Sequence, residues 1–187
     1  MKYKILDEYH HHHHPSDGKC RVLLLFFVKD IINDIRDHAY LGGDAAKDEG
    51  IDVKVADHYI DIADEKNKAL IQRSIGLGIS ECEQKMLFLI KDCLTNNLSL
   101  DSFSREERPE YAIELRVAVG KSRSIIDGLH RSVLDYVTAR ILRDYCLDAY
   151  PAAAERWGAQ MDQDIAKVET QARLLDTPVR RKPWPIW

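Results

Sequence analysis

The sequence lacks the short motifs by which many enzymes are recognised. It has no GxSxG, no P-loop, no HExxH and no GxGxxG, so no serine elbow, phosphate-binding loop, zinc-protease helix or dinucleotide fold is indicated. Carboxylates are plentiful, but none lies in an apolar context that suggests a raised pKa. We therefore expect no enzyme activity, no cofactor and no metal site.

Cysteine pairs and long hydrophobic runs are missing as well. Cys20, Cys82, Cys93 and Cys146 are widely spaced and form no CxxC pair, which favours reduced thiols in a cytosolic setting. The apolar run Val22–Val28 is too short to cross a bilayer. Charged and histidine-rich sequence precedes that run and no small-residue cleavage site follows it, so we expect neither a signal peptide nor membrane contact.

An excess of positive charge is also absent. The 27 Lys and Arg residues are outnumbered by 31 Asp and Glu, and the formal net charge of -4 argues against a domain that binds nucleic acid over its whole surface. The chain of 187 residues, 45% of them hydrophobic, is long enough for one domain with a sizeable core.

Two apolar stripes of helical period dominate what is present. They flank the Tyr150-Pro151 break, and their three- and four-residue steps predict a helical hairpin that buries its seam. The first stripe consists of Ile126, Leu129, Val133, Val137, Ile141 and Tyr145, and the second of Trp157, Met161, Ile165, Val168, Ala172 and Leu175.

Two further helices are predicted before this hairpin. We expect one over residues 20–41, ended by Gly42-Gly43, although a buried strand over Val22–Val28 remains the alternative because short apolar runs fit both structures. The second follows a stripe from Ile71 to Cys93. Gly76 and Gly78 interrupt that stripe without shifting its phase, which indicates close packing against another backbone rather than a kink.

Strict alternation of apolar and other residues over 111–119 predicts a half-buried strand or an extended arm. A lone strand leaves its backbone groups unsatisfied, so it must pair with another segment or with a neighbouring subunit. In the second case, the residues of the intersubunit strand are Tyr111, Ile113, Leu115, Val117 and Val119.

The two ends of the chain have unusual compositions. Residues 1–19 form an N-terminal arm that contains the histidine tract His10–His14, which is either a tag remnant, a polar linker or a metal-binding tract. Residues 176–187 contain three prolines and predict an extended docking arm. Its candidate partner-binding residues are Arg180, Arg181, Lys182, Trp184, Ile186 and Trp187. The flanking tryptophans and prolines favour a protein partner over DNA phosphate for the basic cluster.

Two small clusters of titratable residues were weighed as sites. His58 with Asp57 and Asp61 offers too few ligands for a metal, and Asp127 with His130 fits an ordinary surface pair on a helix. The expected fold is mainly α: a helical bundle built on a long hairpin, with one short strand or extended β-arm and extended terminal arms. Residues 20–175 are expected to form its single helical domain.

Two segments resemble head–tail connector (adaptor) proteins of tailed bacteriophages and prophages. DEKNKALIQRSIGLGISECEQKM, over 64–86, is similar to the long helix that these proteins place after an acidic stretch. IIDGLHRSVLDYVTARILRDYC, over 125–146, is similar to their second long helix. With the helix after Pro151 and the terminal arm, the resemblance covers about two thirds of the chain. The N-terminal extension is longer than in a minimal connector.

The resemblance implies a structural virion protein, assembled in the host cytoplasm, that forms a homo-oligomeric ring between the portal protein and tail components. Such a ring extends the DNA channel, with passing contact to DNA, and terminal arms embrace the portal or a neighbour. The rival interpretation is a cytosolic helical interaction module, such as a dimeric regulator. Its hairpin would form the dimer seam, and its C-terminal tail would dock one partner.

Overall fold

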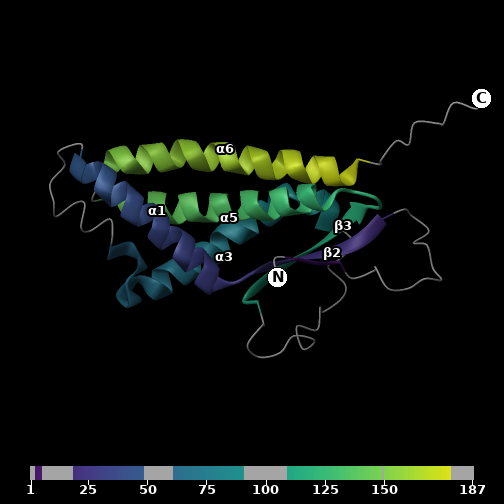
Figure 1. The fold of residues 1–187 in the computed structure, drawn as a ribbon, viewed down its shortest axis with the longest axis horizontal. Helices are drawn as coiled ribbons and strands as arrows, with labels where there is room; N and C mark the ends of the chain where they lie inside the picture. The colour runs from purple at the N-terminus through teal and green to yellow at the C-terminus, as the bar shows by residue number, and fades with distance from the viewer. Residues whose placement is uncertain (1–2, 6–18, 49–60, 91–108, 149, 178–187) are drawn as a thin grey trace, which may run out of the picture.

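The computed structural model describes residues 3–5, 19–48, 61–90, 109–148 and 150–177, and the fold is mostly helical with a small antiparallel sheet (Figure 1). Strands β1 (Tyr3–Ile5), β2 (Lys19–Phe26) and β3 (Tyr111–Ala118) form the sheet in that order. The helices are α1 (Val28–Asp48), α3 (Lys68–Lys85), α4 (Leu87–Ile90), α5 (Arg123–Cys146) and α6 (Pro151–Asp176). Two short 3-10 turns, Asp61–Ala63 and Glu65–Asn67, precede α3.

The apolar run after Cys20 is a strand, so the helix expected over 20–41 is wrong for its first part and the alternative is right. All five side chains from Val22 to Phe26 are buried, which means that both faces of β2 are covered. A strand buried on both faces is apolar at every position and shows no alternation, which is why the sequence pattern resembled a helix.

Helix α1 begins directly after this strand and continues beyond the expected stop. Its first turn is closed by Asp30 N–H and Ile31 N–H, which both donate to the Phe27 carbonyl. Ile31, Ile35 and Ala39 then face the core at helical spacing. The helix runs through Gly42-Gly43 to Asp48, so the two glycines do not end it.

The β2–β3 register places the hydrophobic side chains of both strands against the helices. Val22 lies opposite Leu115, Leu24 opposite Ile113 and Phe26 opposite Tyr111. On the other face Arg21 Nε pairs with Glu114 Oε1, although Glu114 itself is buried. That arrangement neutralises a carboxylate which would otherwise be costly to bury.

The strand predicted over 111–119 is present as β3, but it is not an unpaired arm. It pairs with β2 along all of its eight residues. Tyr111, Ile113, Leu115 and Val117 lie on the core face, with the last three buried and Tyr111 packed against the core, while Val119 lies beyond the strand and is exposed. These four side chains are therefore unavailable to a neighbouring subunit.

Helices α5 and α6 make the most extensive contact between elements, and α6 lies along the outside of α5 (Figure 1). Ser122 caps α5, since its Oγ accepts a hydrogen bond from Ser124 N–H, and Pro151 opens α6 at a position where no N–H is needed. Five of the six residues of the first predicted stripe and three of the six of the second are buried. Tyr145, Trp157, Met161 and Ile165 are half-buried and pack against the core.

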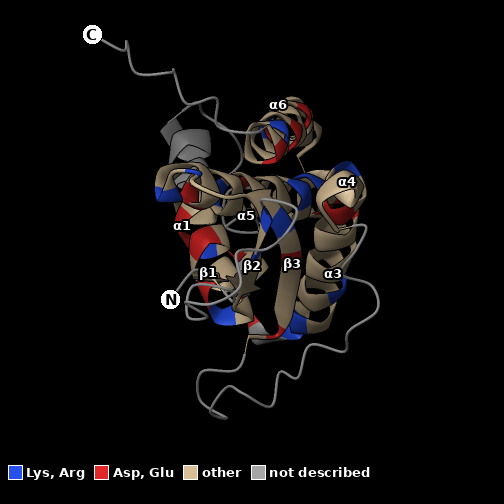
Figure 2. Cartoon of the chain, turned by 90° about the vertical axis from the view of Figure 1, so that its right-hand side faces the viewer, with Lys and Arg blue, Asp and Glu red and all other residues tan. Residues whose placement is uncertain are grey.

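Helices α1 and α3 both contact α5 and lie on either side of it (Figure 2). The close packing predicted at Gly78 is confirmed, because a Cβ at this position would lie 3.1 Å from Val137 Cγ2 of α5. Within the described part of the chain, no helix is both long and apolar enough to cross a membrane.

Candidate functional site

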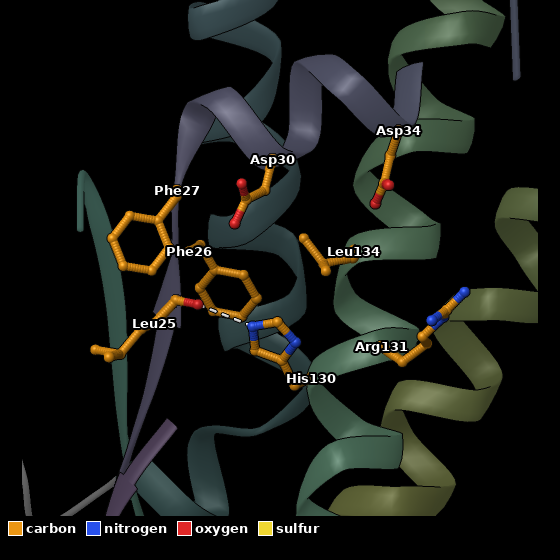
Figure 3. Close-up of a pocket in the computed structure, with 8 residues that line it drawn as sticks. All are labelled: Leu25, Phe26, Phe27, Asp30, Asp34, His130, Arg131 and Leu134. Carbon is orange, nitrogen blue, oxygen red and sulfur yellow. Dashed lines mark hydrogen bonds between the residues drawn. The ribbon is translucent and has the colours of Figure 1, made fainter. Parts of the chain in front are cut away.

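A cleft of about 320 Å³ opens where the end of β2, the start of α1 and the middle of α5 meet (Figure 3). Its apolar side is formed by the last residues of β2 and the Phe27 that follows, together with one leucine of α5. The polar side chains come from α1 and α5. The lining residues are Leu25, Phe26, Phe27, Asp30, Asp34, His130, Arg131 and Leu134.

His130 forms part of the base of this cleft. It is buried, and its Nε2 donates a hydrogen bond to the Leu25 carbonyl at 2.8 Å. Its ring stacks on Phe26 with centroids 4.7 Å apart and the planes almost parallel (Figure 3). The interpretation of Asp127 and His130 as a surface pair is therefore wrong, because only Asp127 is exposed and His130 faces β2.

The charges of the cleft are mostly negative. Asp30 and Asp34 stand one turn apart on α1, so both carboxylates lie on the same side of the opening, and both are exposed. Arg131 lies at the rim and forms an ion pair with Asp135 at 3.9 Å along α5. Lys29 Nζ lies 5.8 Å from the centroid of the Phe27 ring, so cationic side chains of the same chain accompany the two aspartates around the cleft.

A second group of polar side chains joins α3 to α5. Tyr136 Oη donates to Glu81 Oε2 at 2.5 Å, and Arg140 donates to the same oxygen. Burial, with the Glu81 carboxylate next in importance, raises the pKa of the Tyr136 phenol. The neighbouring Cys82 is a buried free thiol, and burial also raises its pKa far above the ordinary range. The Tyr136 phenol and the Cys82 thiol are therefore held in their neutral forms beside the Arg140–Glu81 ion pair, which suits a structural tie between helices.

A third group lies between α5 and α6. Asp164 is almost completely buried and accepts hydrogen bonds from Lys167 Nζ at 2.7 Å and Gln160 Nε2 at 2.9 Å. Burial, with Asp164 as the nearby charge, raises the pKa of the Asp135 carboxyl. The expectation that no carboxylate has a raised pKa is therefore wrong for Asp135, because folding places it beside a second helix.

No group of three or more His, Cys, Asp or Glu side chains in the described ranges is arranged to hold a metal ion. Asp61 pairs with Lys66 at 4.0 Å, while His58 and Asp57 lie outside the described residues. The same holds for His10–His14 and Cys93. The candidate partner-binding residues Arg180, Arg181, Lys182, Trp184, Ile186 and Trp187 also lie outside them, and the predicted arm loses its first residue to α6, which ends at Asp176.

Large apolar side chains are exposed along α3 and α4, a feature that sequence reasoning missed. We call this the α3–α4 surface. The sequence could have shown this surface, because its residues are apolar and lie outside the buried stripe of α3 or after the end of that helix. The surface consists of Leu70, Leu77, Leu87 and Phe88, all at least 40% exposed.

Comparison with known proteins finds no family model that matches this chain, and no curated protein or solved structure that matches it significantly. The functional argument therefore depends on the geometry described above and on the resemblance of the two helical segments.

Proposed function

We propose that this chain is a structural virion protein, a head–tail connector that forms a ring between the portal and tail components and works without catalysis. The two segments that resemble connectors coincide with α3 and α5, and these helices pack directly on each other at Gly78 and Val137. The two segments that resemble connectors therefore belong to the same hydrophobic core. In this proposal the α5–α6 hairpin is the scaffold of a helical bundle.

The observation that carries the proposal is the presence of two different surfaces on opposite sides of α5. A closed ring needs a heterologous interface, in which one face of a subunit meets a different face of the next. Helices α3 and α4, which carry the exposed apolar side chains, lie on one side of α5, and α1, which contributes Asp30 and Asp34 to the cleft, lies on the other (Figure 2). Leu70 and Leu77 are both exposed and stand one heptad apart on α3, a spacing that favours a protein contact along this helix.

The arms and the sheet edge extend this picture. β3 is the last strand of the sheet order, so its outer edge is the place where a neighbouring chain would add a strand. The C-terminal arm follows α6 in the sequence, with Trp184 and Trp187 as anchors for the portal or a neighbouring protein and Arg180 to Lys182 as further partner-binding residues, while passing contact with DNA belongs to the ring as a whole. Residence in the virion after assembly in the host cytoplasm is part of the same proposal.

The alternative, a dimeric interaction module, has one observation in its favour. The α3–α4 surface would also serve as a self-complementary dimer interface. The hairpin seam would not, because its central residues Val133, Val137 and Ile141 are buried within the chain.

The test is capture of partners from a lysate of the source, using the full chain and a truncation after Thr177. The cut is placed there because Asp176 belongs to α6 and pairs with Lys19 at 2.9 Å. We expect unchanged helicity by circular dichroism, recovery of a large ring-forming partner with several copies of the full chain, and loss of that partner on truncation. Mass spectrometry identifies the partner, and mass measurement of the complex gives the copy number.

A full chain with two exposed leucines replaced, Leu70→Ser and Leu77→Ser, serves as the second variant. It should remain folded and lose ring formation, since both leucines project into solvent from α3. Recovery of one small partner, or a stable isolated dimer of the full chain, would contradict the connector and favour the interaction module.

A further inference from the structure

The imidazole of His130 ties the end of β2 to the middle of α5. The Leu25 carbonyl can only accept a hydrogen bond, so the 2.8 Å contact places the proton of the neutral ring on Nε2. The side chain is 4% exposed, and its ring lies flat on Phe26 with 4.7 Å between the centroids (Figure 3). Folding therefore encloses a group that takes up a proton at about pH 6.5 in an unfolded chain.

Protonation would add a positive charge to this enclosed ring. A charged donor strengthens the hydrogen bond to the carbonyl roughly twofold. Removal of an ion from water opposes the charged form more strongly, because Phe26 and the surrounding core keep solvent away from the ring. Burial therefore favours the neutral imidazole in this position.

The charged groups of the surrounding elements do not reverse this balance. Asp30 and Asp34 of α1 line the cleft, but both are exposed, so solvent screens their attraction for an imidazolium. Arg131, the next residue of α5, and Lys29, beside the Phe27 ring, carry the same charge as the imidazolium and oppose it.

Two further carboxylates lie on the neighbouring elements. Asp127, one turn earlier on α5, is exposed, and Glu110 Oε2, before β3, accepts a hydrogen bond from Val28 N–H at 3.1 Å. Strand β2 contributes no titratable side chain at Leu25 or Phe26. The carboxylates that a charged ring would meet in the cleft are therefore those of α1, on the wall opposite the ring (Figure 3).

We propose that His130 is an acid-sensitive latch, which holds the end of β2 and the start of α1 against α5 and opens when the imidazole is protonated. The charged ring leaves the Leu25 carbonyl and turns into the cleft toward Asp30 and Asp34. The cleft volume of about 320 Å³ gives the ring room for this movement. The inference goes beyond the connector proposal and concerns the conformation of a single chain.

The direction of the pH dependence follows from proton binding. The closed state binds fewer protons at His130 than the open state, so acid shifts the equilibrium toward opening. The latch is closed above about pH 6.5, where the imidazole is neutral in both states, and is lost as the pH falls below that value. One proton changes the opening equilibrium at most about tenfold per pH unit.

Hydrogen exchange of the full chain, followed by mass spectrometry at pH 7.5 and 5.5, tests the latch. After correction for the intrinsic effect of pH on exchange, we expect peptides that cover the end of β2 and the start of α1 to exchange up to about tenfold faster at pH 5.5. His130→Gln should lose this acceleration, because its amide can donate to the Leu25 carbonyl but does not titrate. His38→Gln is the matched control and should behave as the parent chain, since His38 is exposed and does not line the cleft. The same acceleration in the parent chain and His130→Gln, or none in the parent chain, would overturn the proposal.

A second pair of variants keeps the histidine and changes its destination. With Asp30→Asn and Asp34→Asn together, the open state loses the carboxylates that receive the ring, so the midpoint of opening should fall by about 0.5–1 pH unit. Asp37→Asn removes the same charge from an exposed position of α1 outside the cleft and should leave the midpoint unchanged. An unchanged midpoint in the Asp30→Asn, Asp34→Asn chain would refute the movement toward these carboxylates. This arm decides the proposal even where circular dichroism finds that His130→Gln does not fold.

Discussion

At the scale of single residues, the two glycines of α3 look alike in the sequence and differ in the fold. A Cβ on Gly78 would lie 3.1 Å from Val137 Cγ2 and 3.4 Å from Arg140 Cδ. A Cβ on Gly76 would lie 3.5 Å from Tyr111 Oη, which is an ordinary contact distance. Only Gly78 is therefore required for the close approach of α3 to α5. Gly76 lowers the helix propensity of α3, and the packing at this position does not require a glycine.

Gly76→Ala is expected to stabilise the protein by about 0.5–1 kcal/mol, because alanine is the better helix former and fits this site. Gly78→Ala should give no such gain, and Gly78→Leu should cost roughly 2 kcal/mol or more through overpacking against Val137. Urea unfolding of the three variants measures the differences. Equal stabilisation by both alanine substitutions would mean that α3 and α5 are further apart than described.

The buried thiol of Cys82 makes stability depend on pH. Burial raises its pKa from the ordinary value of 9.0, with Glu81 and Glu83 adding to the effect. The unfolded thiol therefore ionises above about pH 9 while the folded one keeps its proton, so the unfolded state binds fewer protons and stability falls as pH rises. The slope for one such group is about 1.4 kcal/mol per pH unit.

We expect the free energy of unfolding to fall between pH 9 and 11, by a smaller amount in Cys82→Ala than in the parent chain. Tyr136 and Tyr145 also have raised pKa values, so part of the slope should remain in the variant. Urea titrations at pH 7, 9 and 10.5 test this. Identical slopes in both chains would show that the thiol is exposed to solvent.

At the scale of elements, the helical stripes were predictable from the sequence. Of the sheet, the sequence predicted strand β3, but it favoured a helix where β2 lies. Ile126, Val133 and Ile141 recur at helical spacing because they lie on one buried face of α5, although α1, α3 and α6 also bury other parts of this helix. β2 gave the wrong signal, because its partner strand begins 85 residues after its own last residue, at Tyr111. Whether the second face of β2 is buried depends on contacts with residues distant in the sequence, and the local pattern of apolar residues carries no information on them.

Ile141 provides the test of the α5–α6 packing. It is 3% exposed, whereas Leu147, directly after α5, is 50% exposed. Ile141→Asp should unfold the domain, since an unpaired charge would be buried, with a loss of roughly 3–5 kcal/mol. Leu147→Asp should change stability by less than about 0.5 kcal/mol. Thermal unfolding by circular dichroism compares them, and a wild-type melting temperature in Ile141→Asp would place that side chain outside the core.

At the scale of the whole molecule, the sequence predicted a mainly helical domain and the position of its longest helices. It did not predict the cleft, because Asp30, Asp34 and His130 come from segments about 100 residues apart that meet only after β2 and α5 pack. His130 was noticed but assigned to the surface, since Asp127 one turn away makes an ordinary pair on a helix. The α3–α4 surface was in principle readable, as Leu70 and Leu77 are one heptad apart on the polar side of α3.

The ion pair between Lys19 and Asp176 has a mechanical consequence. It joins the first residue of β2 to the last residue of α6, so the folded domain is closed at one point and the C-terminal arm departs beside the entry of β2. A load applied between the C-terminal arm and the segment that precedes β2 would act across this short contact. Both side chains are partly exposed, so the pair adds only about 0–1 kcal/mol and would be the first contact between these two ends to yield. Strand β2 would then still be held by its pairing with β3, and α6 by its packing on α5.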